Sequence, residues 1–352
     1  MDKDLRNSLE PPALADLFLR HPPEGFTAGV TPEGLPFFHT GFDLLTTFDR
    51  EALKRLQRLP LFRLWSKALR VQACFAGTTV SEYAPLPRGL EAEALLSAAL
   101  REGEGAALTI IKDLPASSPL LSPEDNAFSA ALSERALAGS FMEVDGQALA
   151  YVPVDFTNVE QCLDRLSAAR RKDLRRKWKT REKVALKVLP LGDDLFSSRA
   201  FLDELYGMYL EVFAQSHMHF DLLDREFFAA LLQSGMPGAV LCYYAESTLA
   251  GYNICLIHDG RLIDKYIGFR YPLARELNLY FISWLVNLEF ALERGLHTYV
   301  AGWTDPEVKA ALGARFTFTR HLVYVRNPLL RGLLRPFRRF FEGDRRSLEA
   351  GA

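Results

Sequence analysis

The sequence predicts an α/β protein built from two similar halves. Its length of 352 residues suits two domains, because one domain usually takes about 100 to 200 residues. A strand, helix, strand order can be traced before residue 160 and again, more clearly, after it. This alternation is typical of sheets with helices packed on their faces.

Composition and charge exclude several classes of protein. Hydrophobic residues make up 49% and charged residues 24% of the chain, which are values of an ordinary globular protein rather than of a disordered or fibrous one. The net charge of −2 does not indicate a nucleic-acid or membrane partner. A surface for such a partner would therefore be a local patch.

Signals for targeting and cross-linking are weak. The charged first residues lead to Pro11-Pro12 without an apolar segment, so we expect no secretory signal. The most apolar stretch, Leu279 to Leu292, is too short to span a bilayer and contains Asn287 and Glu289. The four cysteines form no C-x-x-C pair. We therefore expect a soluble cytoplasmic protein whose cysteines lie in its core.

The chain begins with an irregular extension, residues 1–36, which is rich in Pro and Gly. After it, apolar residues at helical spacing between 43 and 69 predict two short helices that are separated at Pro60.

The rest of the first half predicts a sheet with one covering helix. Strands are expected over 71–76 and 107–112, with a helix over 90–101 between them. In the segment 141–152, Asp145-Gly146 separates two apolar runs. Because this pair supplies the positive φ that a two-residue turn needs, it predicts a hairpin.

A strongly basic segment follows the first half. Residues 165–183 contain ten basic and two acidic residues. The segment has neither Gly nor Pro, which predicts a helix at the junction of the halves. The basic residues are Arg165, Arg170, Arg171, Lys172, Arg175, Arg176, Lys177, Lys179, Arg181 and Lys183.

The second half contains the clearest pattern in the sequence. Three strands, 239–245, 249–257 and 261–267, are joined by turns at Glu246-Ser247 and Asp259-Gly260 and predict an antiparallel meander. A long helix from Leu277 to Arg294 then ends at Gly295, a frequent C-terminal cap. The other elements expected are helices over 200–213, 226–232 and 306–312 and strands over 297–300 and 317–325.

This element order resembles that of the GNAT acyltransferase superfamily, and short motifs narrow the resemblance. The segments that resemble the C-terminal signature of its FemABX-like branch are Leu279-Tyr280-Phe281, Arg294 to Tyr299, Gly302-Trp303, Val308-Lys309 and Leu312-Gly313-Ala314. That branch comprises tandem-GNAT proteins, among them the aminoacyl-tRNA-dependent peptidoglycan bridge enzymes. The basic helix also resembles the Arg/Lys-rich helix that follows the first domain in that family.

The resemblance covers residues 37–328 and implies two tandem GNAT-like domains, each a mixed, mostly antiparallel sheet flanked by helices. The domain order expected is an extension over 1–36, a first domain over 37–157, a basic linking helix over 158–185, a second domain with the donor site over 186–328, and a basic amphipathic tail over 329–352.

One turn departs from the superfamily pattern. Acetyl-CoA enzymes hold the pyrophosphate on a Gly-rich turn before the long helix, where bare backbone N–H groups meet the anion. Here residues 268–275 contain one glycine, Gly268, and two arginines, Arg270 and Arg275, which can replace part of the amide cradle. The turn therefore predicts a modified donor site, for a differently held acyl thioester or for a tRNA terminus. The donor-binding residues implied are Gly268, Arg270, Arg275, Asn278, Gly302 and Trp303.

The resemblance implies three catalytic candidates. Lys309 follows Gly302-Trp303, where the family has a lysine that can stabilise the oxyanion formed when an amine attacks an ester or thioester. Asp264, in the third meander strand, can take the proton of that amine. Tyr280 can donate a proton to the leaving group. The alternatives are a solvated lysine, a paired charge at a strand edge, and a core tyrosine.

His217 and His219 lie in a loop that the resemblance places over the acceptor, and His217 is a fourth catalytic candidate. The two histidines could share a metal, but no third ligand is near them in sequence, so we expect no metal site.

The sequence leaves alternatives for the functions of two basic segments. Arg171, Lys172, Arg175 and Arg176 could contact tRNA or another anion, or could form a solvated face. The tail from Leu329 to Phe341 mixes arginines with Leu and Phe, so it could touch a membrane surface weakly or dock on the protein.

The function expected is N-acyl transfer by direct attack, because no G-x-S-x-G elbow and no Cys–His pair suggests a covalent intermediate. The donor would be acyl-CoA or another thioester, with no tightly bound cofactor. The acceptor would be the amine of a small molecule or of a peptidoglycan-precursor-like compound. Two alternatives stay open: aminoacyl-tRNA-dependent transfer, and a non-catalytic tandem-GNAT binding protein.

Overall fold

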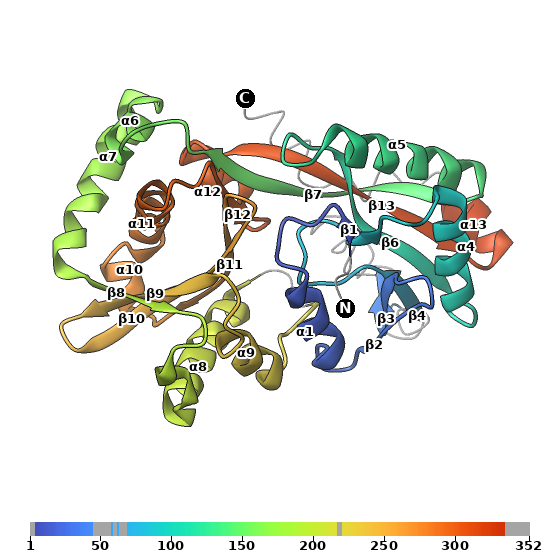
Figure 1. Ribbon diagram of the computed structural model, residues 1–352, viewed down its shortest axis with the longest axis horizontal. Helices are drawn as coiled ribbons and strands as arrows, with labels where there is room; N and C mark the ends of the chain where they lie inside the picture. Colours follow the sequence, from blue (N-terminus) through green and yellow to red (C-terminus); the bar gives the residue numbers. More distant parts are fainter. Residues whose placement is uncertain (1–3, 45–57, 59–61, 63–68, 217–219, 335–352) are drawn as a thin grey trace. The chain divides into compact units, whose positions relative to one another are not determined.

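The computed structural model describes residues 4–44, 58, 62, 69–216 and 220–334. The two short helices expected between residues 43 and 69 fall almost wholly outside this part of the chain. The chain divides into two compact units (Figure 1). The first unit comprises Met1–Ser8, Phe18–Ala148 and Thr317–Ala352, and the second comprises Leu9–Leu17 and Leu149–Phe316. The basic segment thus lies inside the second unit, and the last strand inside the first.

The first unit is a mixed sheet with the strand order β2-β3-β4-β6-β13 and two covering helices, α4 and α5. Among the described strands of this sheet, only β4 and β6 run parallel, and the helix α4 lies between them in sequence. Its strands are β1 (Leu5–Arg6), β2 (Thr27–Val30), β3 (Pro36–Asp43), β4 (Arg70–Ala76), β5 (Leu86–Pro87), β6 (Leu108–Ser117) and β13 (Arg315–Val325), and its helices are α4 (Ala92–Glu102), α5 (Pro123–Ala138) and α13 (Pro328–Leu334).

The second unit repeats this arrangement. Its strand order is β7-β12-β11-β10-β9-β8, and the strands β11 and β12 form its parallel pair. Its strands are β7 (Met142–Pro153), whose residues up to Ala148 belong to the first unit, β8 (Ala185–Pro190), β9 (Gly238–Ala245), β10 (Thr248–His258), β11 (Arg261–Phe269) and β12 (Thr298–Gly302). Its α-helices are α1 (Ala13–Arg20), α6 (Val159–Asp164), α7 (Ala168–Trp178), α8 (Arg199–Gln215), α9 (Arg225–Leu232), α10 (Leu273–Glu276), α11 (Leu279–Glu293) and α12 (Pro306–Ala311), and its 3-10 helices are η3 (Lys179–Lys183) and η4 (Asp194–Ser197).

The two units therefore share one strand pattern, in which antiparallel pairings, two in the first unit and three in the second, lead to a parallel pair, and a further antiparallel strand closes the set. This confirms the fold class expected, two GNAT-like α/β units with mixed, mostly antiparallel sheets. The predicted meander is β9, β10 and β11, and the predicted long helix is α11.

The closing strand of each unit comes from the other half of the sequence. β7, at the end of the first half, pairs with β12, and β13, at the end of the chain, pairs with β6. The strand β7 continues through Asp145-Gly146 without a turn, so these residues do not form a hairpin. The predicted hairpin is therefore wrong. Gly146 serves another purpose: a Cβ there would collide with Thr319, whose hydroxyl accepts the N–H of Gln147 at 3.1 Å.

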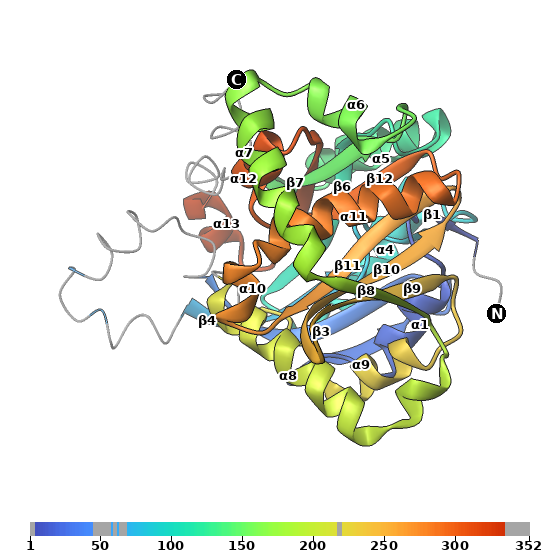
Figure 2. The same cartoon turned by 90° about the vertical axis from the view of Figure 1, so that its left-hand side faces the viewer.

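The sheet of the second unit has different helices on its two faces (Figure 2). Side chains alternate between the faces of a strand. Tyr252 donates its hydroxyl to the Leu205 carbonyl of α8 at 2.8 Å, whereas its neighbour Asn253 points to the opposite face, toward α11. The layer between α11 and the sheet holds a large core of buried apolar side chains, including Leu285, Leu288 and Tyr299.

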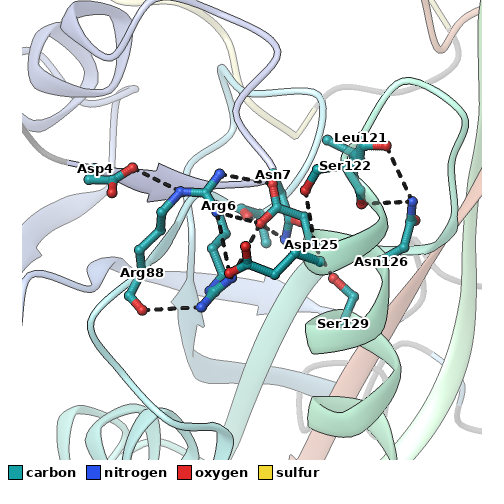
Figure 3. Close-up of polar contacts among 11 residues, drawn as sticks. Asp4, Arg6, Asn7, Arg88, Leu121, Ser122, Asp125, Asn126 and Ser129 are labelled. Carbon is teal, nitrogen blue, oxygen red and sulfur yellow. Dashed lines mark hydrogen bonds and ion pairs between the residues drawn. The ribbon is translucent and has the colours of Figure 1, made fainter.

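A charged cluster anchors the N-terminal strand in the first unit (Figure 3). Arg88 binds both carboxylate oxygens of Asp125 at 2.8 and 3.0 Å and pairs with Asp4 at 2.8 Å. Arg6 pairs with Glu124 at 2.7 Å. Both Glu124 and Asp125 lie in the first turn of α5, where negative charge is also favoured by the helix dipole.

Within the described residues, no helix combines the length and apolar character that crossing a bilayer requires.

Candidate active site

The candidate site lies where the parallel strands of the second unit stop pairing. The β11–β12 ladder ends at Ile263 and Val300, although each strand continues beyond that point. Asp264 is the first residue of β11 after the ladder. The free carboxyl ends of adjacent parallel strands are a usual place for ligands in α/β sheets.

Three donors hold the carboxylate of Asp264. Asn253 on β10 donates its Nδ2 to both oxygens, at 3.0 and 2.8 Å. Asn287 on α11 donates to Oδ2 at 2.9 Å, and the Tyr299 hydroxyl on β12 donates to the same oxygen at 3.0 Å. Sγ of Cys255 lies 3.9 Å from Oδ1. All four partners are almost completely buried, and Asp264 itself keeps partial exposure.

This setting gives Asp264 an unusual acidity. Burial raises the pKa of its carboxyl from 3.8 to about 6, while the hydrogen bonds from Asn253 and Tyr299 and the charge of Lys309 act in the opposite direction. A carboxylate with a pKa close to neutrality is ionised at physiological pH and yet basic enough to accept a proton.

Lys309 is buried, with only 5% of its surface exposed. It lies on α12, and its Nζ donates to the Ala301 carbonyl, at the end of β12, at 2.6 Å. A Cβ at Gly302 would lie 3.8 Å from the Asp264 carbonyl and 3.9 Å from Nζ of Lys309, so these two residues flank Gly302. Solvated lysines are seldom buried to this degree.

Tyr280 lies on α11 seven residues before Asn287. Burial raises the pKa of its hydroxyl, and the charges of Asp305 and Asp264 raise it further. The hydroxyl therefore stays protonated and can donate a hydrogen bond beside Asp264.

The donor turn has few free amide groups. The N–H groups of Arg270 and of residues 274–278 donate to carbonyls within the chain. The N–H of Tyr271 donates to the Glu211 carboxylate of α8 at 3.0 Å. The short helix α10 fills the turn and consumes the donors that a pyrophosphate would need.

The two arginines of the turn have partners on α8. Arg270 pairs with Glu204 at 2.6 Å and donates Nε to the Leu249 carbonyl at 2.9 Å. Arg275 donates to the Gln215 side chain at 2.5 Å and stacks on Tyr271. To reach a donor phosphate, each would exchange its contact with α8.

The other donor-binding candidates surround the same region. Gly268 is buried near the end of β11, and a Cβ there would collide with the Tyr252 ring. Asn278 begins α11 with a left-handed φ of 55°, and Gly302 has a φ of 76°. Trp303 is partly buried after β12. His217 and His219 lie outside the described residues, so their predicted roles stay predictions.

The cations of α7 are mostly paired with acidic side chains nearby. Arg175 binds Glu160 at 2.6 Å, Arg176 binds Asp173 at 2.7 Å and Arg171 contacts Asp164 at 3.6 Å, while Lys172 is exposed. No group of three potential metal-ligating side chains meets within the described ranges.

The residues that hold Asp264 were not singled out from the sequence. Their signal was present, because Asn253 and Asn287 interrupt runs of apolar residues in a strand and in a helix. A buried amide in such a run requires a polar partner. Which partner it has depends on the packing of α11 over β10 and β11.

The model of the FemAB-like family, described as peptidoglycan biosynthesis/recognition, matches residues 104–350, which is well over half of the chain. The search of curated proteins found no match.

Several solved structures share the fold at low sequence identity. The C-terminal domain of a putative lysylphosphatidylglycerol synthetase from Agrobacterium fabrum has a TM-score of 0.55 at 9% identity, over 91% of this chain and 92% of that one. L-PGS from Bacillus licheniformis has a TM-score of 0.55 at 11% identity, over 97% and 100%. FemX has a TM-score of 0.55 at 11% identity, over 95% and 96%.

The extent of the family match decides the assignment, and the shared fold agrees with it. The chain therefore belongs to the FemAB-like family, and it shares the fold of FemX.

Proposed function

We propose that the second unit transfers an aminoacyl group from an ester donor to an amine by direct attack. The amine nitrogen forms a bond to the acyl carbon, and the bond from that carbon to the leaving oxygen breaks. Asp264 accepts the proton of the amine, Lys309 stabilises the negative charge on the carbonyl oxygen, and the proton finally passes to the leaving hydroxyl. The observation that carries this proposal is the ionisable carboxylate beside a buried ammonium group where β11 and β12 separate.

The donor turn favours an aminoacyl ester, such as the 3′ end of a charged tRNA, over acyl-CoA. Its amide groups are used inside the chain, and the side chains of Arg270 and Arg275 are bound to α8. A coenzyme A pyrophosphate would therefore lack an amide cradle there. This weighs against the acyl-CoA donor that the sequence placed first.

The acceptor proposed is the free amine of a peptidoglycan precursor. The family description, peptidoglycan biosynthesis/recognition, supports this choice. One structure of similar fold is named for lysylphosphatidylglycerol synthesis, so a lipid headgroup is the comparison acceptor.

We also propose a weak contact between the C-terminal segment and an anionic membrane surface. In α13, Leu329 is 83% exposed and Leu330 is 49% exposed. The sequence beyond this helix adds Arg335, Arg338 and Arg339 among Phe residues. Such a mixture suits a negatively charged lipid surface.

The test of the activity is single-turnover transfer with purified full-length protein. Radiolabelled aminoacyl-tRNA and acetyl-CoA are offered in parallel with a peptidoglycan precursor peptide that has a free lysine amine. We expect amide product from the aminoacyl-tRNA and its loss in the variant Asp264→Ala. Equal transfer from acetyl-CoA would overturn the donor assignment. The absence of amide product from both donors would overturn the proposed activity.

A further inference from the structure

Several buried polar atoms around Asp264 have no hydrogen-bond partner among the described residues. Oδ1 of Asn253, the hydroxyl of Tyr280 and Nε1 of Trp284 are three of them, and the hydroxyl of Tyr243 on β9 is a fourth. Buried polar atoms are nearly always paired in folded proteins, since an unpaired one has lost its water without compensation. Three of them in the layer between α11 and the sheet therefore require an explanation.

All three are tied closely to Asp264. Asn253 binds its carboxylate directly. Trp284 packs edge-on against the ring of Tyr299, with ring centroids 5.1 Å apart, and Tyr299 also donates to Asp264. The charge of Asp264 raises the pKa of Tyr280 in addition to burial.

The helix α11 places two of these groups, Tyr280 and Trp284, in line with Asn287. Tyr280, Trp284 and Asn287 are separated by four and three residues on α11, so they lie on the same face of the helix. Asn287, at the inner end of this stripe, binds Asp264 and Tyr299. The stripe thus runs along the sheet from the start of α11 to the carboxylate.

The chemistry of the three atoms restricts what can satisfy them. An indole N–H only donates, so Trp284 requires an acceptor. Asn253 has committed its Nδ2 to the carboxylate, which leaves its Oδ1 as an acceptor that requires a donor. The hydroxyl of Tyr280 can do either. A group that satisfies all three must present a donor and an acceptor close together.

We infer that Trp284, Tyr280 and Asn253 form the binding subsite for the transferred acyl group. Trp284 and Tyr280 donate to its carbonyl oxygen, and Oδ1 of Asn253 accepts from its amino group. The inference rests on the proposed function and adds the residues that recognise the acyl group. An aminoacyl group satisfies the subsite, whereas a hydrocarbon acyl group leaves Asn253 unpaired.

Two ester probes of equal size test the subsite. Alanyl and propionyl 3′-esters of adenosine differ only in that an amino group replaces a hydrogen, and the acceptor is the same precursor peptide. For the wild-type protein we expect kcat/KM for the alanyl ester to exceed that for the propionyl ester by at least about tenfold, because a site built to bind a polar group rejects the analogue that lacks it.

The variant Trp284→Phe removes the indole N–H and keeps an aromatic ring against Tyr299. We expect kcat to fall about tenfold or more with both esters, the preference for alanyl to remain, and the acid limb of the pH profile to stay in place. A merely structural role would move that limb, since Tyr299 would shift against Asp264. The control is Trp178→Phe, which alters a partly buried tryptophan of the same core that has no tie to Asp264 and should leave turnover unchanged.

Each outcome decides something. Equal use of the two esters, or wild-type turnover in Trp284→Phe, would overturn the subsite and leave the proposed function standing. If the wild-type protein transferred from neither ester, the proposed function would fail and the subsite with it.

Discussion

Asp264 and Lys309 carry opposite charges in a mostly apolar layer, and they have different hydrogen-bond partners. Asp264 is held by three donors that favour its ionised form, while burial favours its neutral form. Lys309 donates to the Ala301 carbonyl, and its ammonium group can also stabilise a carbonyl oxygen that develops negative charge.

Removing the charge of Lys309 tests its role. The variant Lys309→Met keeps the length and the apolar stem, so we expect it to fold and to lose turnover by about 100-fold or more, as for loss of one oxyanion donor. The measurement is single-turnover transfer at saturating donor, with a thermal melt to confirm folding. A folded variant with near-wild-type turnover would show that Lys309 does not act in catalysis.

The acidity of Asp264 predicts two opposite responses to pH. Turnover should fall as the pH drops below about 6, because the protonated carboxyl cannot accept the proton of the amine. Stability should change the other way. The pKa in the folded state, about 6, lies above the ordinary 3.8, so the folded state binds more protons in this window and loses stability as the pH rises through it.

Both responses can be measured together, with kcat/KM across the pH range and urea unfolding at about pH 4.5 and pH 7. The variant Asp264→Asn does not titrate here and serves as the control, with the pH dependence of its unfolding reduced. A rate that does not change between about pH 5 and pH 8 would contradict the assignment of Asp264 as the base.

At the scale of elements, the donor turn and α8 are linked by side chains rather than by backbone. Arg270 reaches Glu204, Arg275 reaches Gln215, and Glu211 reaches the N–H of Tyr271. These partners lie at intervals of seven and four residues on α8, so they share one face of that helix. The face therefore sets which side chains of the turn can meet a donor.

Arg270 is predicted to contact donor phosphate after leaving Glu204. The variant Arg270→Ala should raise the dissociation constant of the donor about tenfold, for a loss of about 1.4 kcal/mol. The matched control is Glu204→Gln, which weakens the same ion pair and keeps the arginine, and it should bind the donor at least as tightly as the wild type. Equal weakening in both variants would mean that Arg270 only tethers α8.

The strand β7 packs closely against Thr319 at Gly146. Because a Cβ at residue 146 would collide with the Thr319 side chain and lie 3.0 Å from its backbone carbon, we expect Gly146→Ala to destabilise the fold by about 1–3 kcal/mol. Thr319→Ala in the same chain should restore part of that loss, which a double-mutant cycle by urea unfolding can measure. An unchanged midpoint in Gly146→Ala would show that the strands separate there without cost.

At the scale of the whole molecule, the sequence predicted what depends on local pattern and missed what depends on distant pairing. The meander and α11 follow from turn residues and helical period, and both are confirmed. The strands β7 and β13 pair with β12 and β6, which lie far from them in sequence. A local pattern does not show such pairing, so Asp145-Gly146 was interpreted as a turn. The same limit applies to the site: Asp264 and Lys309 were predicted from the family resemblance, whereas Asn253, Asn287 and Tyr299 become polar partners only where strands and a helix bring them together.

The C-terminal segment decides whether the whole protein meets a membrane. Arg331 fixes α13 to the first unit by donating to the Val325 carbonyl at 3.0 Å and stacking on Tyr324, while Leu329 and Leu330 remain exposed.

We expect the full-length protein to sediment with vesicles that contain phosphatidylglycerol, and to sediment more weakly at high salt because the arginines are screened. Binding should fall about tenfold when both leucines are changed to serine. Leu137→Ser, at a leucine of α5 that is 44% exposed, is the matched control and should bind as the wild type does. Wild-type binding by the double variant, or equal binding to vesicles of phosphatidylcholine alone, would refute the contact and leave the leucines as a surface for another partner.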